Sequence, residues 1–211
     1  MRNPVLAVLG SLALGACSVA GIRSGTEEPA YQVVDRLGPD VEVRRYGPRL
    51  AAETTVADAD DWQARSTAFK LLAGFISGGN RPRAKIAMTA PVAVAGPEKI
   101  AMTAPVGMAC GPDGLTMRFF MPAQYTRATL PEPSDARVRI VEVPEETVAV
   151  LRFTGSTGEE AVARHEAELT ALLARSDWQS AGPAVALFYD PPWTLPFRRR
   201  NEVAVPVTPR S

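Results

Sequence analysis

The chain has 211 residues, of which 46% are hydrophobic, 22% charged and 7% aromatic. This composition supplies enough apolar material for one sizeable core and excludes intrinsic disorder. Lys plus Arg and Asp plus Glu both total 23, so the formal net charge is zero. A nucleic-acid-binding domain would carry a net basic surface, and we therefore expect no nucleic-acid partner.

The N-terminal segment has the features of an export signal. Residues 5–16 form an apolar run that is too short to span a bilayer as a helix. The run leads into the residues LGAC, which resemble a bacterial lipobox with a diacylglycerol on the sulfur of Cys17. We predict a lipoprotein signal peptide over residues 1–16, and a lipidated Cys17 with a flexible tether over residues 17–30. An ordinary signal peptide with an incidental cysteine is the alternative.

The residue after the predicted lipidation site bears on location. Ser18 stands where an Asp would indicate retention at the inner membrane. Acyl chains anchor firmly, because each buried methylene contributes about 0.8 kcal/mol. We therefore expect a lipid-anchored protein of the bacterial cell envelope, at the outer membrane and facing the periplasm. Cys110 would then have no partner for an intramolecular disulfide.

Two strands and a helix are predicted in the first half of the folded region. Residues 41–46 alternate like a half-buried strand, and residues 50–56 do the same after a Gly-Pro turn. A helix is predicted over residues 61–77, because apolar side chains recur on one face at helical spacing. That face consists of Ala68, Leu72, Phe75 and Ile76.

A duplicated segment follows the first helix. The octapeptide KIAMTAPV occupies residues 85–92 and recurs unchanged at residues 99–106. Its proline cannot donate a ladder hydrogen bond and therefore favours a strand end or a sheet edge. Another strand is predicted over residues 116–121.

The second half repeats this plan. A helix is predicted over residues 159–176, and Ser156 with Glu159 has the spacing of a capping box at its start. Leu169, Leu172 and Leu173 match Leu72, Phe75 and Ile76 at an offset of 97 residues (72 to 169). The accompanying strands are expected at residues 137–143, 147–153, 184–189 and 202–207.

The matching halves predict the fold class. We expect an α+β fold, a distorted and mainly antiparallel β-barrel with two helices, built from two pseudo-symmetric strand-strand-helix-strand halves. A single ligand-binding domain would extend over residues 31–208. Between the two halves we expect an apolar crevice that is wide enough for a planar ring system.

No catalytic motif is found in the sequence. Paired-cysteine metal motifs, a nucleophile elbow, a P-loop and a dinucleotide fingerprint are all missing. His165 is the one histidine, which excludes an imidazole-rich metal site. We therefore expect a binding protein and not an enzyme.

Four sequence blocks resemble the SOUL family of heme-binding proteins. They are residues 41–46, the SGGN that ends the first helix, the doubled KIAMTAPV, and residues 189–203. The blocks come in the family's order across residues 31–207. The resemblance implies a distorted two-helix barrel of two similar halves. It also implies non-covalent binding of heme or a related tetrapyrrole, as a carrier, buffer or sensor.

The resemblance places a flat, apolar slot beside the first helix and the C-terminal loop, with cations for the heme propionates at its mouth. Thioethers adapt to irregular apolar surfaces, so methionines of the duplicated segment are included. A purely structural role in the core is the alternative for the helix residues and for the methionines, and a solvated strand end is the alternative for Arg198 and its two neighbours. Ser66, Gly74 and Thr194 depart from the family pattern, because some members carry basic residues at these positions. The implied ligand contacts are Phe69, Leu72, Ala73, Phe75, Met88, Met102, Tyr189, Trp193 and Arg198.

His165 borders the apolar stripe of the second helix and is a candidate axial ligand of heme iron. A histidine at the helix edge, or one satisfied by a hydrogen bond, is the alternative, and the heme could then lack a strong axial ligand. Two further functions stay open. One is a binding module for other amphipathic small molecules, since two-helix barrels of this kind resemble the drug-binding domains of some transcription effectors. The other is an enzyme that modifies tetrapyrroles.

Overall fold

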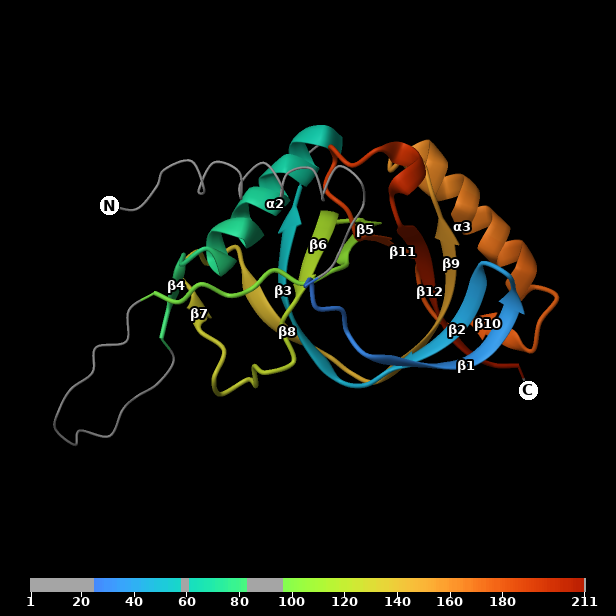
Figure 1. Ribbon diagram of the computed structural model, residues 1–211, viewed down its shortest axis with the longest axis horizontal. Coiled ribbons are helices and arrows are strands. Elements are labelled where there is room, and N and C mark those ends of the chain that lie inside the picture. The colour runs from blue at the N-terminus through green and yellow to red at the C-terminus, as the bar shows by residue number, and fades with distance from the viewer. Residues whose placement is uncertain (1–24, 58–60, 83–96, 211) are drawn as a thin grey trace, which may run out of the picture.

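The computed structural model describes residues 25–57, 61–82 and 97–210 (Figure 1). The predicted signal peptide, Cys17, and the first KIAMTAPV copy with Met88 lie outside these residues. Within the described ranges, every helix is too short or too polar to cross a membrane.

The first half of the chain contributes one long helix and six strands. These elements are β1 (Tyr31–Gly38), β2 (Val41–Tyr46), β3 (Arg49–Val56), α2 (Asp61–Ile76), β4 (Asn80–Arg81), β5 (Val106–Gly111) and β6 (Gly114–Phe120).

The second half contributes the other long helix, a 3-10 turn and six strands. These elements are β7 (Glu132–Pro133), β8 (Arg139–Val143), β9 (Glu146–Phe153), α3 (Glu159–Leu173), β10 (Trp178–Ser180), β11 (Val185–Phe188), η1 (Pro196–Arg198) and β12 (Asn201–Pro209).

Ten strands form one curled antiparallel sheet. Its hydrogen-bonded order is β1-β2-β9-β12-β11-β5-β6-β3-β8, and β10 pairs with β12. The two helices lie outside this sheet, on opposite flanks in Figure 1. In the described part of the chain the hydrogen-bonded path ends at β1 and β8, so the barrel is not closed. The predicted α+β fold with two helices and a mainly antiparallel sheet is confirmed.

The two halves exchange strands at a pseudo-twofold axis. Strand β2 pairs with β9 and places Tyr46 opposite Glu146, and β3 pairs with β8 and places Arg49 opposite Val143. Arg49 and Glu146 are 97 residues apart, which is the offset that also relates the two helices. Applying this offset to one ladder reproduces the register of the other. Each half therefore completes its sheet with strands of the other half.

Each helix covers its own part of the sheet. The apolar face of α2 packs on β3 and β6, where Leu72 and Met117 are fully buried. The apolar face of α3 packs on β9 and β12, where Leu169 contacts a cluster that includes Val43 and Val203. Successive side chains of β2 point to opposite faces of the sheet. Val41 and Val43 therefore face α3, while the intervening positions face away from it.

The predicted capping box of the second helix is wrong. The N-cap of α3 is Gly158, in an extended conformation and without a side-chain cap. The Ser156 hydroxyl instead accepts a hydrogen bond of 3.2 Å from the Gly158 N–H. Ser156 therefore stabilises the turn before the helix, and Glu159 has no serine partner at the cap. The helix ends at Leu173 and not at residue 176.

A buried charge cluster ties the start of β12 to neighbouring strands. Glu202 is fully buried and accepts hydrogen bonds from Arg44 (2.9 Å), Arg200 (3.0 Å) and the Tyr189 hydroxyl (2.6 Å). Arg200 also donates to Glu28, at 3.0 Å. Burial alone would lower the pKa of Arg44, but the charge of Glu202 raises it above its ordinary value. A buried carboxylate favours the folded state only as long as its hydrogen-bond donors are present.

We expect Glu202→Gln to lower the free energy of unfolding by about 3 kcal/mol, because Arg44 and Arg200 would lose their buried counter-charge. Urea unfolding followed by circular dichroism measures this change. The matched control is Asp135→Asn, which removes an exposed partner of Arg137 and should leave the unfolding midpoint in place. Equal midpoints for Glu202→Gln and wild type would contradict a structural role for the cluster.

Candidate functional site

The residues of α2 that were predicted to contact a ligand divide between two environments. Leu72 and Phe75 are 0% and 2% exposed and belong to the core, in agreement with the structural alternative for these positions. Phe69 is 43% exposed, and its ring meets that of Phe119 edge-on at 5.5 Å. Ala73 is partly buried. On this helix, Phe69 is therefore the predicted contact whose large side chain is accessible to a ligand at the surface.

The predicted ligand contacts in the loop between β11 and β12 also divide into buried and exposed residues. Tyr189 is buried, and its hydroxyl is used by Glu202, so it supports the loop from below. Trp193 is 64% exposed, and Arg198 is exposed with its guanidinium 5.9 Å from the centre of the Phe197 ring. The tip of this loop thus presents aromatic rings and a cation to solvent.

Internal hydrogen bonds hold the loop in shape. The Arg199 guanidinium donates to the carbonyl oxygens of Thr194 (2.8 Å) and Pro192 (2.6 Å). The Thr194 N–H donates to the Pro191 carbonyl at 3.0 Å, and the Gly155 N–H donates to Pro196 at 2.9 Å. Because Arg199 serves the loop itself, Arg198 is the neighbouring arginine that faces outward.

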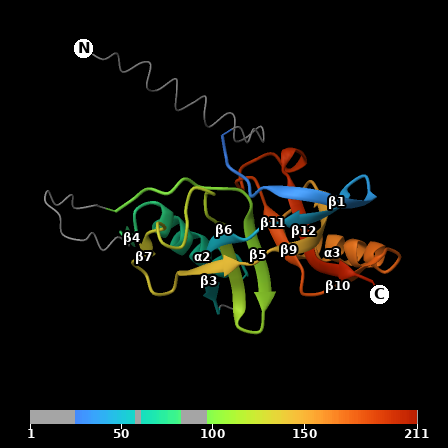
Figure 2. The ribbon, with the colours of Figure 1, turned by 90° about the horizontal axis from the view of Figure 1, so that it is seen from below.

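The segment that carries Met102 is fastened beside α2 and β6. Its Ile100 N–H donates to the carbonyl of Ile76 at the end of α2 (2.8 Å), and the Thr103 hydroxyl donates to the Phe120 carbonyl. Met102 is 44% exposed between these two attachments. Figure 2 shows this segment and the loop before β12 on the same side of the molecule, whereas Figure 1 shows the loop at the top, between the two helices, and the segment lower down.

Large apolar side chains are exposed mainly on these three segments. The described residues have seven exposed large hydrophobic side chains, and all but Tyr31 belong to α2, the Met102 segment or the loop. Exposed large apolar side chains are candidates for an interaction surface. We refer to these six residues as the exposed apolar set, which consists of Trp62, Phe69, Met102, Trp193, Leu195 and Phe197.

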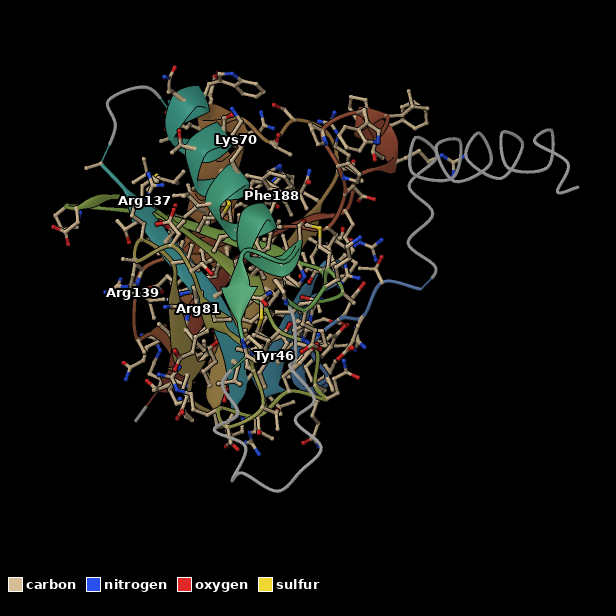
Figure 3. All side chains as sticks on the ribbon, turned by 90° about the vertical axis from the view of Figure 1, so that its left-hand side faces the viewer. Tyr46, Lys70, Arg81, Arg137, Arg139 and Phe188 are labelled. Atoms are coloured by element: carbon tan, nitrogen blue, oxygen red, sulfur yellow. The ribbon has the colours of Figure 1, made fainter. Side chains whose placement is uncertain are left out.

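A shallow hollow lies beside the C-terminal half of α2. Its volume is about 230 Å³, and it is bordered by Lys70, Gly74 and Phe75 and by the segment around Asp135. In Figure 3, which faces this side, Lys70 lies on α2 and Arg137 lies to its left. The Arg137 guanidinium lowers the pKa of Asp135 to about 2 through two side-chain hydrogen bonds. Phe75 is the predicted ligand contact that reaches this hollow.

The space between the two halves is much smaller than expected. Side chains of both halves fill it except for a cavity of about 70 Å³. Pockets for small molecules usually enclose about 300–1,000 Å³. The prediction of a crevice wide enough for a planar ring system is therefore wrong, because apolar side chains of facing strands meet across the axis.

His165 lies on α3, outside the three segments of the exposed apolar set. Its ring stacks on that of Phe153, with centroids 4.2 Å apart, and its Nδ1 lies 3.1 Å from an oxygen of Glu168. This arrangement matches the alternative of a packed, hydrogen-bonded histidine. Among the residues that the structure describes, three or more His, Cys, Asp or Glu side chains nowhere gather as a metal site would require.

Sequence reasoning did not single out Trp62, Leu195 and Phe197. The hydrophobic pattern cannot distinguish a buried from an exposed apolar residue in a loop, and Trp62 lies at the start of a helix whose other apolar residues are mostly core. The available signal was the proline-rich context of Leu195 and Phe197, since such loops lie at the surface.

These features define a pseudo-twofold α+β domain with two outer helices and an exposed apolar surface. The chain belongs to the SOUL heme-binding protein family, whose model matches residues 26–206. The mouse protein named heme-binding protein 2 is 29% identical over 197 residues, which cover 87% of this chain and 89% of the relative. The human protein of that name is 30% identical over 135 residues, which cover 61% and 60%.

Solved structures confirm the fold. The C-terminal domain of EcmrR superposes with a TM-score of 0.57 at 8% identity and covers 85% of this chain and 98% of that domain. A protein from Listeria innocua described as a hydrolase has a TM-score of 0.55 at 14% identity, with 80% and 92% covered. At these identities the likeness concerns the arrangement of strands and helices alone.

The division between core and surface on α2 and the loop can be tested by stability. We expect Leu72→Ala to cost about 3 kcal/mol of unfolding free energy, because it leaves a cavity in a closed core. Phe197→Ala should stay within about 0.5 kcal/mol of wild type, because its ring is two-thirds exposed. Chemical denaturation measures both values. A large loss for Phe197→Ala would show that this ring supports the fold.

Proposed function

We propose that this chain is a non-covalent binding protein for heme or a related tetrapyrrole, acting as a carrier, buffer or sensor and not as an enzyme. Membership of the SOUL heme-binding protein family supports the ligand class. The observation that carries the location is the exposed apolar set, whose members lie on α2, the Met102 segment and the β11–β12 loop. The family resemblance implies a ligand slot beside α2 and this loop.

The surface chemistry suits a flat macrocycle with apolar faces and two propionates. Burial of apolar surface contributes about 25 cal/mol per Å², and aromatic rings provide large flat areas at low conformational cost. Trp193 and Phe197 would contact the macrocycle from the loop, and Phe69 would contact it from α2. Arg198 is exposed at the loop tip and would pair with a propionate.

Iron coordination by His165 is not part of this proposal. Its ring is stacked on Phe153 and hydrogen-bonded through Nδ1, and it lies on the helix that carries no member of the exposed apolar set. Binding would depend on apolar contact and propionate pairing. His165→Ala is then expected to leave the Soret maximum of the bound hemin unchanged.

Hemin titration of the full-length chain in detergent should give a saturable Soret shift at one-to-one stoichiometry. Replacing Trp193 and Phe197 together by serine should weaken binding by about tenfold or more, because 1.4 kcal/mol corresponds to a factor of ten. The control is Tyr31→Ser on β1, which removes an exposed ring outside the three segments.

Two outcomes would contradict the hemin proposal. One is uptake that does not saturate and equals that of detergent alone. The other is equal affinity of wild type and the double variant, which would move the site away from the loop. Displacement of hemin by lipophilic dyes of unrelated structure would instead favour a general binding module for amphipathic molecules. Altered mass of the recovered tetrapyrrole would favour an enzyme.

We also propose that the domain is attached to the bacterial envelope through a lipid on Cys17, at the outer membrane and facing the periplasm. The support is the LGAC sequence before the tether. In a bacterial host, labelled palmitate should enter the wild-type chain. Cys17→Ala should abolish the labelling, whereas Cys110→Ala should leave it intact. Labelling that persists in Cys17→Ala would exclude this anchor.

A further inference from the structure

The cavity between the two halves has an unusual lining for its size. It lies at the pseudo-twofold axis, where Arg49 and Glu146 are related by the offset of 97 residues. Figure 3 places Tyr46, another lining residue, toward the lower end of the strands and away from α2. Most of the wall is apolar and includes Phe120, Val143, Val148, Leu187 and Pro206.

One buried guanidinium in this wall lacks hydrogen-bond partners. Arg49 Nη2 donates to an oxygen of Glu146, and the guanidinium lies over the rings of Tyr46 (4.2 Å) and Phe120 (4.9 Å). The Nε and Nη1 atoms of Arg49 are buried, and neither has a hydrogen-bond acceptor in the described structure. The aromatic rings cover the faces of the guanidinium, but the remaining N–H groups point outward in its plane.

The side chains that line the cavity carry more positive than negative charge. Arg118 also lines the cavity, and together with Arg139 it is paired with Glu53, at 2.5 Å and 3.0 Å. Among the described residues that line the cavity, the guanidinium groups of Arg49 and Arg118 outnumber the one carboxylate, that of Glu146, whereas Arg139 and Glu53 do not belong to the lining. Burial lowers the pKa of Arg49, and the charge of Glu146 only partly offsets this effect.

Buried polar groups are almost always satisfied in native proteins, and an unsatisfied charged donor costs more than a neutral one. A bound anion would satisfy the free N–H groups of Arg49. An apolar wall cannot solvate a second negative charge or further oxygens, which disfavours phosphate and sulfate.

We propose that this central cavity binds a small monocarboxylate with a short apolar body. The carboxylate would accept hydrogen bonds from Arg49, and the apolar body would pack against Phe120, Val148 and Leu187. A cavity of about 150 Å³ holds benzene with its six non-hydrogen atoms, so a cavity of about half that volume suits a carboxylate with a one-carbon body, such as acetate. This site is separate from the exposed apolar set.

The probe is acetate, titrated into the full-length chain and followed by calorimetry and by the Arg Nε–H resonances in nitrogen-15 spectra. We expect saturable binding with a dissociation constant of about 1 mM or lower, and a shift of the Arg49 resonance. Acetamide, of nearly the same shape but without the charge, should bind at least tenfold more weakly. Arg49→Met should abolish acetate binding, and Arg45→Met, at an exposed position on β2, should not affect it.

A second variant tests the cavity without removing the charge. Gly107 lines the cavity, and a Cβ atom added there would meet Leu187, Val185 and Arg118 at ordinary contact distances of 3.7–3.8 Å. Gly107→Ala should therefore fold normally, yet weaken acetate binding by about tenfold through lost volume. Hemin titration of the same variants should be unchanged, so failure here and failure of the heme proposal are distinguishable.

Three outcomes would overturn the carboxylate proposal. They are the lack of saturable acetate binding, equal binding of acetate and acetamide, and loss of binding in Arg45→Met to the same extent as in Arg49→Met. In each case the free N–H groups of Arg49 would be satisfied by water alone.

Discussion

The fold depends on the reciprocal exchange of strands at the pseudo-twofold axis. β2 finds its partner in β9, and β3 finds its partner in β8, so each half supplies the hydrogen bonds that the other lacks. An unpaired strand edge carries a row of unsatisfied backbone groups, which is why neither half would be stable alone. The exchange also brings residues 46–49 and 143–146 together at the axis and places Arg49 against Glu146.

This constraint determines where ligands can bind. Between the facing strands, the described residues leave a small cavity of about 70 Å³ that Arg49 lines with two unpaired nitrogen atoms. That volume is too small for a large planar ligand. The exposed apolar set lies on segments outside the exchanged strands, where variation in side chains does not disturb the central pairing.

The buried carboxylate of Glu202 connects the sheet with the proposed ligand surface. It accepts hydrogen bonds from Arg44 on β2 and from Arg200 and Tyr189 at the two ends of the β11–β12 loop. The base of the loop is thereby fixed to the sheet, while Arg199 holds its tip in shape. A loop supported in this way can expose Trp193 and Phe197 without collapsing them onto the core, which is a requirement for a preformed binding surface.

Much of the architecture could be predicted from sequence, because hydrophobic periodicity and internal repetition are local properties of the chain. The faces of both helices, the main strands and the offset of 97 residues between halves follow from the positions of residues such as Leu72 and Leu169. Tertiary structure alone decided that Phe75 is core while Phe69 is exposed, that Tyr189 serves Glu202, and that Arg49 is left with free donors. Burial and hydrogen-bond satisfaction depend on which distant strands meet, and no local pattern carries that information.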